Sequence, residues 1–273
     1  MIRRLHKNLG VYEGKVPDAS AQLEREGWAW LPWVFDRDEV DEMKAEIDAV
    51  FAEYPAERGR DDAEEFRYEM FNRSAACQRA IAAPRILEAI DPLLGDDCHV
   101  IANTAWKNPP DFKGGPWHCD AGPHVPRPED VAWDDRIPYP VFAVAAHIML
   151  DDCRLEDGPT AVIPGSHRSG RLAPFDRMYD ENLTYDGRSP RVFEVWAGDV
   201  VLFVSDAWHR GLPAREGGHG RFFLQAHYAR RDIAQRVHAT DRTNHCSPEA
   251  IGRAQSERDR TLIGLHEPFF YDG

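Results

Sequence analysis

The second half of the chain consists of short apolar runs separated by glycine, proline and aspartate, and this pattern restricts the possible fold more than any other feature. Several short strands at such regular spacing are typical of a β-sandwich or barrel. The runs cover residues 98–106, 116–120, 141–150, 160–164, 192–196, 199–204, 207–212 and 221–229. The sequence therefore predicts a mainly β core between about residues 98 and 230.

Helical patterns are concentrated before this core. After Asp36, which can cap a helix, apolar residues recur every three or four positions as far as Val50. Because the helices come first and the strands follow, we expect a helical layer that packs on one face of the β core. The expected helices cover 18–27, 36–51 and 74–94, with a break at Pro84, and a last one covers 247–262.

The length of 273 residues fits one large domain with an ample core. We predict a single domain with a helical N-terminal layer at 18–95, the β core at 98–230, and a C-terminal helix and tail at 231–273. Its 47 acidic and 33 basic residues give a net charge of −14. This charge disfavours nucleic acid or an anionic membrane as the main partner, because both select for clustered positive charge.

The five cysteines are scattered and contain no CxxC pair. A disulfide framework or a zinc cluster is therefore not expected, and a reducing cytoplasm is the expected location. The basic N-terminus has no apolar run behind it, so a signal peptide is not expected. No stretch approaches the roughly 20 apolar residues that a membrane-spanning helix requires.

One set of residues has the composition of a metal site: His118 and Asp120, then His209, then Arg221. Alternation along a strand would place His118 and Asp120 on one side, with Cys119 pointing away. Two histidines and one carboxylate form the three-ligand face of non-haem Fe(II) oxygenases, which leaves the opposite positions open. Arg221 lies twelve positions after His209, and a fixed cation near an open iron suits a dicarboxylate cosubstrate such as 2-oxoglutarate.

The context of these residues matters more than any one of them. A single His–Asp pair is more often a hydrogen-bonded pair, and His209 alone would more often be a core or surface histidine. GPW precedes HCD, however, IPGSH follows it, and GDVVLF leads into WHRG. This order favours a metal site over a hydrogen-bonded His–Asp pair and a separate core or surface histidine.

These segments resemble the phytanoyl-CoA dioxygenase (PhyH) family of Fe(II)/2-oxoglutarate oxygenases over roughly residues 20–230. The similar stretches are EREGWAWLPWVFDRDEVDEM, WHCD, EDGPTAVIPGSHRSG and GDVVLFVSDAWHRG. The resemblance implies a double-stranded β-helix, which is a cupin-like jelly-roll core with flanking helices. It also implies a dioxygenase that uses Fe(II), 2-oxoglutarate and O2 to hydroxylate or otherwise oxidise a small organic molecule, with release of succinate and CO2.

The resemblance also assigns roles to single residues. His118, Asp120 and His209 would hold the iron, and Arg221 would pair with the distal carboxylate of 2-oxoglutarate. Three further residues could contact the cosubstrate: Lys107, Thr160 and His147. The alternative for Lys107 is a solvated surface lysine. The alternative for Thr160 and His147 is ordinary packing in the core.

Some positions depart from the family pattern or refine it. Asp157-Gly158 stands in place of the family's Asn-Gly, and it should still make the turn. His167 is expected to fix that turn or to bind backbone, because the triad is complete without it. Related halogenases have a small residue in place of the carboxylate, so Asp120 favours hydroxylation or another oxidation over halogenation.

Two other functions remain open at this level. One is a cupin-like metalloenzyme that does not use 2-oxoglutarate, for which Arg221 would be an ordinary surface residue. The other is a non-catalytic jelly-roll binding protein. The expected partner in the main interpretation is a small-molecule substrate, with contacts from the loop 121–140, the segment 171–190 and the C-terminal tail.

Overall fold

The computed structural model describes residues 15–54, 65–120, 122–235 and 246–265. Two antiparallel sheets form its centre, one with the strand order β1-β7-β4-β9-β3-β2 and the other with the order β6-β5-β8. The strands are β1 (Trp28–Leu31), β2 (Glu65–Arg67), β3 (His99–Asn108), β4 (Ala143–Met149), β5 (Thr160–Val162), β6 (Arg191–Val192), β7 (Val200–Val204), β8 (His209–Gly211) and β9 (Arg221–Ala229).

The two sheets pack against each other through a buried apolar cluster. Ala145 of β4 and Phe203 of β7 contribute from the larger sheet, and Val162 of β5 contributes from the smaller one. Side chains alternate between the two faces of a strand, so β4 and β9 can contribute side chains both to this cluster and to the opposite face of the sheet. The prediction of a mainly β, jelly-roll core with flanking helices is confirmed.

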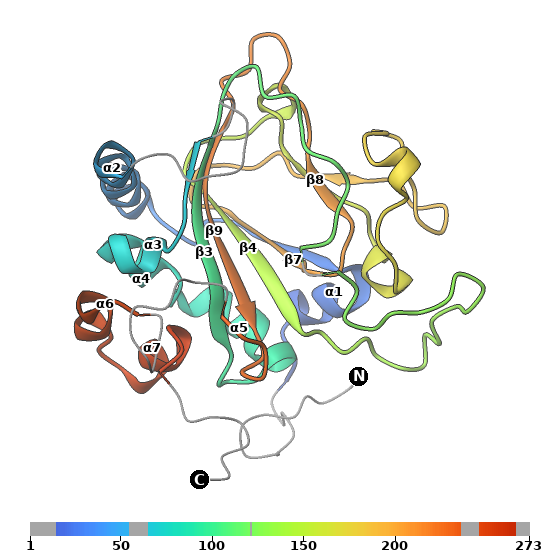
Figure 1. Ribbon diagram of the computed structural model, residues 1–273, viewed down its shortest axis with the longest axis horizontal. Coiled ribbons are helices and arrows are strands. Elements are labelled where there is room, and N and C mark those ends of the chain that lie inside the picture. Colours follow the sequence, from blue (N-terminus) through green and yellow to red (C-terminus); the bar gives the residue numbers. More distant parts are fainter. Residues whose placement is uncertain (1–14, 55–64, 121, 236–245, 266–273) are drawn as a thin grey trace.

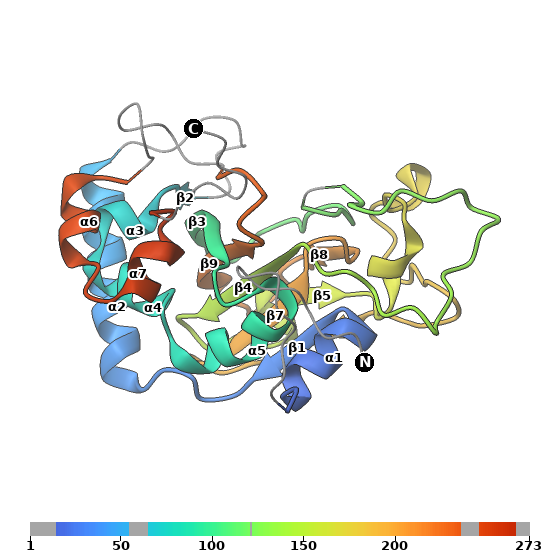
Figure 2. The same cartoon turned by 90° about the horizontal axis from the view of Figure 1, so that it is seen from below.

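The helices gather on the other face of the six-stranded sheet (Figures 1 and 2). Their apolar faces form the largest core cluster together with residues of β3, β4, β7 and β9. Helices therefore flank this face of the sheet. The helices are α1 (Asp18–Glu26), α2 (Arg37–Glu53), α3 (Met70–Arg73), α4 (Ala75–Ala80), α5 (Pro84–Leu94), α6 (Pro248–Arg253) and α7 (Glu257–Leu262). None of the helices within the described ranges has the length and apolar character needed to cross a membrane.

The start of α2 shows why the predicted helix forms where it does. The Asp36 carboxylate accepts a 2.9 Å hydrogen bond from the Glu39 amide, and the Glu39 carboxylate accepts one of 2.9 Å from the Asp36 amide. This reciprocal capping satisfies two of the free N–H groups at a helix start. The helix then buries Val40, Met43, Ile47 and Val50.

Two sequence predictions of secondary structure are wrong in detail. The helix expected over 247–262 is divided, because Ser256 and Asp259 form a new capping box that starts α7 after α6 has ended at Arg253. The segment 116–120 is not a regular strand.

The C-terminal tail, which was expected to contact the substrate, comprises residues 266–273 and lies outside the described residues. Most of the charged segment 53–66 lies outside them too.

The segment 116–120 nevertheless lies beside β8. His118 and His209 exchange two backbone hydrogen bonds of 3.0 Å each, and the Asp120 amide donates to the Ser205 carbonyl at 3.0 Å. These bonds bring His209 next to His118 and Asp120, which lie about 90 positions earlier in the chain. Backbone pairing therefore places the proposed ligands next to each other before any metal is considered.

Candidate metal and cosubstrate site

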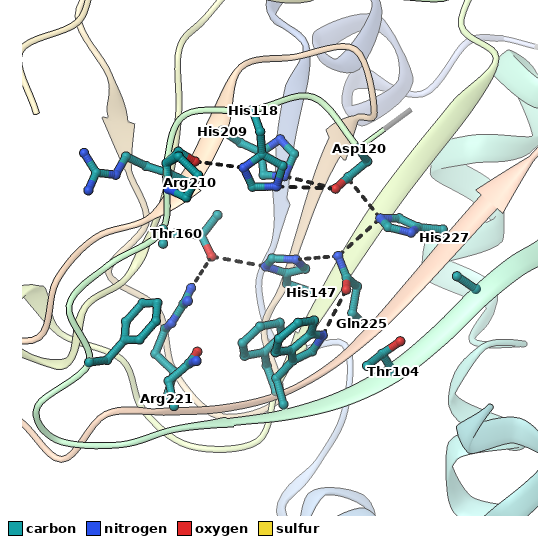
Figure 3. A pocket seen from close by; sticks show the side chains of 18 of the residues that line it. Thr104, His118, Asp120, His147, Thr160, His209, Arg210, Arg221, Gln225 and His227 are labelled. Atoms are coloured by element: carbon teal, nitrogen blue, oxygen red, sulfur yellow. Dashed lines mark hydrogen bonds and ion pairs between the residues drawn. The ribbon is translucent and has the colours of Figure 1, made fainter. Parts of the chain in front are cut away.

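A cavity of about 630 Å³ opens between the two sheets (Figure 3). Its size is within the range of pockets that hold small organic ligands. Strands β3, β4, β5, β8 and β9 contribute to its wall, together with the segment 115–120. The polar residues that line it are Thr104, Asn108, His118, Asp120, His147, Thr160, His209, Arg210, Arg221, Gln225 and His227.

His118, Asp120 and His209 each present one ligand atom in this cavity, and these three atoms lie within 4.8 Å of one another. Asp120 Oδ1 is 3.7 Å from His118 Nε2 and 3.4 Å from His209 Nε2. Donors bound at about 2.1 Å to one ion on a shared face lie roughly 3–4 Å apart. The spacing and the donor types therefore fit a single divalent metal ion.

Backbone carbonyls fix the orientation of both imidazoles. His118 Nδ1 lies 2.8 Å from the Pro116 carbonyl, and His209 Nδ1 lies 2.9 Å from the Ala207 carbonyl. A carbonyl can only accept, so each Nδ1 carries the hydrogen and each Nε2 keeps its lone pair. Burial lowers the pKa of His209, which keeps the ring neutral and able to bind a cation.

Asp120 is the anionic member of the set. Burial raises the pKa of its carboxyl, but the neighbouring imidazoles of His209 and His227 outweigh burial and hold the pKa well below its usual value. Asp120 is therefore ionised, as a metal-binding carboxylate must be.

Arg221, Thr160 and His147 form a second polar group in the same cavity. Arg221 Nη1 donates a 2.8 Å hydrogen bond to Thr160 Oγ1, and His147 Nδ1 is 3.1 Å from the same oxygen. Burial is the main cause that lowers the pKa of His147 well below 6.5, and the charge of Arg221 adds to it. The structure thus brings together all three residues that the sequence placed near a cosubstrate on strands of the core.

Lys107 is the exception, and the structure does not bring it to the cavity. Trp106 and Asn108 face the cavity from β3, so alternation points Lys107 to the opposite face. There its Nζ lies 2.5 Å from Asp48 of α2 and over the rings of Phe51 and Phe222. The expected contact of Lys107 with the cosubstrate is therefore not supported by its position.

Sequence reasoning missed Gln225 and His227, which line the cavity from β9. The signal was available, because Gln225 and His227 are four and six positions after Arg221 and so share its face of the strand. His167, by contrast, lies where expected: it is buried, and its Nε2 is 3.1 Å from the Glu24 carbonyl. It binds backbone and takes no part in the metal group.

A separate surface hollow contains residues of the loop 121–140 and the segment 171–190, from which substrate contacts were expected. Arg127, Trp133 and Arg171 line it together with the segment 183–188. Arg171 is paired there with Glu129 at 2.5 Å. None of these three residues lines the cavity that holds His118 and Asp120.

A jelly-roll core with this cavity defines a class of enzymes, the non-haem iron oxygenases that depend on 2-oxoglutarate. Within that class, the family model for phytanoyl-CoA dioxygenase (PhyH) matches residues 23–221, and the chain belongs to this family. The match covers β1 through the first residue of β9, and so includes both histidines, Asp120 and Arg221.

Solved structures with similar folds include three enzymes of the same kind. The epimerase SnoN, in complex with Fe3+, alpha ketoglutarate and nogalamycin RO, has a TM-score of 0.62 at 18% identity, with 93% of each chain covered. The alpha ketoglutarate dependent carbocyclase SnoK from nogalamycin biosynthesis has a TM-score of 0.62 at 20% identity, covering 84% of this chain and 90% of SnoK. HygX from Streptomyces hygroscopicus, with nickel and 2-oxoglutarate bound, has a TM-score of 0.62 at 15% identity, covering 84% of this chain and 93% of HygX. At these identities the similarity shows a shared fold.

Proposed function

We propose that His118, Asp120 and His209 hold the Fe(II) of a 2-oxoglutarate-dependent dioxygenase, and that Arg221 and Thr160 bind the distal carboxylate of 2-oxoglutarate. The observation that carries this proposal is the presence of both groups in one cavity. Three ligand atoms within 4.8 Å of one another share that cavity with a buried guanidinium.

The cosubstrate assignment depends on the environment of Arg221. Its side chain is only 7% exposed, so it is not the ordinary surface arginine of the cupin-like alternative. A guanidinium presents a planar fork of donors that matches a carboxylate, and burial strengthens such a pair. The Thr160 hydroxyl beside it can add a further hydrogen bond. His147 is neutral and touches Thr160, so we assign it to the support of this hydroxyl.

The protein positions the reactants and encloses them in the cavity. When bound, Fe(II) and 2-oxoglutarate supply the oxidation of a C–H bond by O2, with formation of succinate and CO2. The three residues would hold the ion from one side and leave its other side open to the cavity. Phe112 and Phe223 line that cavity and keep it largely apolar around the polar groups. Because Asp120 occupies the carboxylate position, oxidation without halogenation is the expected outcome.

The expected substrate is a small organic molecule. A cavity of about 630 Å³ supports this. The structures of similar fold support it too, since they include complexes with nogalamycin RO and with hygromycin B.

The test of the proposed function is O2 uptake by the iron-loaded protein with and without 2-oxoglutarate. We expect uptake, with equal formation of succinate, only when 2-oxoglutarate is present. Uptake that does not depend on 2-oxoglutarate would favour the cupin-like metalloenzyme. Iron binding without any uptake, in the presence of a broad set of candidate substrates, would favour the non-catalytic binding protein.

A further inference from the structure

We propose that His227 and Gln225 are positioning residues: His227 orients the Asp120 carboxylate for binding iron through one oxygen, and Gln225 orients the Thr160 hydroxyl toward the cosubstrate. This inference rests on the metal and cosubstrate sites proposed above. Both residues lie on β9 beyond Arg221, and both face the cavity (Figure 3).

The two oxygens of Asp120 have different neighbours. Oδ1 faces the imidazoles of His118 and His209, at 3.7 and 3.4 Å. Oδ2 lies 3.0 Å from Nε2 of His227, whose side chain is buried. An ionised carboxylate can only accept hydrogen bonds, so His227 Nε2 must be the donor.

This contact has a consequence for the metal site. A free carboxylate can rotate and offer either or both of its oxygens to a cation. With Oδ2 held by His227, Asp120 can offer only Oδ1 on the side of the two histidines. Partners of this kind behind a ligating carboxylate typically change metal affinity by about 10–100-fold when removed.

Gln225 acts on the cosubstrate side through its fixed amide orientation. Trp106 Nε1 is a donor only, and it lies 3.0 Å from Gln225 Oε1, so this oxygen is the acceptor. The Gln225 amide nitrogen then faces His147 Nε2 at 3.3 Å and His227 Nε2 at 3.2 Å. The orientation of Gln225 therefore decides which nitrogen of His147 carries the hydrogen.

The hydrogen positions follow step by step. Gln225 donates to His147 Nε2, so the hydrogen of neutral His147 lies on Nδ1 and is donated to Thr160 Oγ1. Arg221 donates to the same oxygen. Thr160 Oγ1 thus accepts twice, and its own O–H hydrogen is left to point into the cavity, where a carboxylate could accept it.

His227 cannot serve both of its neighbours with one nitrogen. A ring nitrogen that donates to Asp120 has no lone pair to accept from Gln225. The charged carboxylate is the stronger acceptor, since hydrogen bonds to ionised groups are roughly twice as strong as neutral ones. The Asp120–His227 bond therefore takes precedence, and the Gln225 amide donates to His147.

The test for His227 uses metal binding without turnover. Co(II) affinity is measured by calorimetry, and the visible spectrum of bound Co(II) reports its ligand geometry. We expect His227→Phe to weaken Co(II) binding by about 10–100-fold and to change the spectrum. His227→Gln, which can place a donor near the same point, should recover most of the affinity. Equal Co(II) affinity and spectrum for the wild type and His227→Phe would overturn the role of His227.

Gln225 has a different expected readout. Gln225→Met keeps the size of the side chain but cannot donate, so 2-oxoglutarate affinity of the Co(II)-loaded protein should fall by about three- to tenfold. Its Co(II) affinity should stay within twofold of the wild type. Unchanged 2-oxoglutarate affinity in Gln225→Met would overturn the role of Gln225.

Two controls separate this inference from the proposed function. Asp120→Ala should abolish Co(II) binding; if it does not, the proposed metal site itself is wrong. If Asp120→Ala loses the metal while His227→Phe binds it normally, only the positioning role fails. Thermal unfolding of the metal-free variants checks that each one folds, and His227→Leu replaces His227→Phe in the same test if the larger ring is not accommodated.

Discussion

The guanidinium of Arg221 and the hydroxyl of Thr160 are joined by a 2.8 Å hydrogen bond between Nη1 and Oγ1. Arg221 begins β9 of the large sheet and Thr160 begins β5 of the small sheet, so this bond connects the two sheets across the cavity. Both side chains are buried. A carboxylate that enters the cavity can pair with this buried guanidinium, and charge-assisted hydrogen bonds of this kind are among the strong ones.

Replacing Arg221 should therefore affect the cosubstrate more than the metal. We expect Arg221→Gln to raise the dissociation constant for 2-oxoglutarate at least tenfold, equivalent to about 1.4 kcal/mol, while Co(II) affinity stays unchanged. Arg215→Gln is the matched control, because that arginine is half exposed and lies 4.0 Å from Glu181 on the surface. Equal 2-oxoglutarate affinity in Arg221→Gln and the wild type would contradict the cosubstrate assignment.

Lys107 provides a prediction of the opposite kind. Its Nζ is bound to Asp48 on the face of β3 that points to α2, away from the cavity. We expect Lys107→Met to change the dissociation constant for 2-oxoglutarate by less than twofold. Titration of the metal-loaded variant with 2-oxoglutarate measures this directly, and a tenfold loss would show that Lys107 reaches the cosubstrate after all.

His167 should make the stability of the fold depend on pH. Burial is the main cause that lowers its pKa to about 4 in the folded protein, from 6.5 in the unfolded chain. Below pH 6.5 the unfolded chain gains a proton on this ring that the folded protein does not accept until about pH 4. The contribution of His167 is therefore fully present above pH 6.5, and about 3 kcal/mol of unfolding free energy is lost as the pH falls to 4.

Urea unfolding at several pH values between 7 and 4 measures this loss. The control variant is His167→Gln, which stays neutral throughout and can still donate to the Glu24 carbonyl. We expect the unfolding free energy of the variant to fall less steeply with acid than that of the wild type. Parallel pH profiles for the two proteins would show that His167 does not titrate in this way.

Local patterns in the sequence predicted much of the fold. The cap at Asp36 and the helical spacing after it predicted α2, and Pro84 predicted the break between α4 and α5. The division between α6 and α7 was not predicted. Residues on both sides of Ser256 form helices, and only the capping box at Ser256 separates them. Local propensity identifies helix-forming stretches more reliably than the points where competing caps end them.

The parts of the site that follow from strand alternation and from the order of the motifs were predicted. These two signals predicted that His118 and Asp120 would lie together, and order along the chain added His209 and Arg221. The direction of Lys107 depended on the register of β3 against β9, which pairs Lys107 with Phe222 and is not visible in either strand alone. The contact between His227 and Asp120 was missed for the same reason, because it joins residues 107 positions apart.

The most direct test of the account is an anaerobic optical titration of the metal-free protein, first with Fe(II) and then with 2-oxoglutarate, for the wild type and Asp120→Ala. We predict that the wild type binds one Fe(II) and then develops a weak visible charge-transfer band on addition of 2-oxoglutarate, and that the variant shows no band. Iron binding without a band in the wild type, or an equal band in Asp120→Ala, would contradict the assignment of this cavity as the iron and 2-oxoglutarate site.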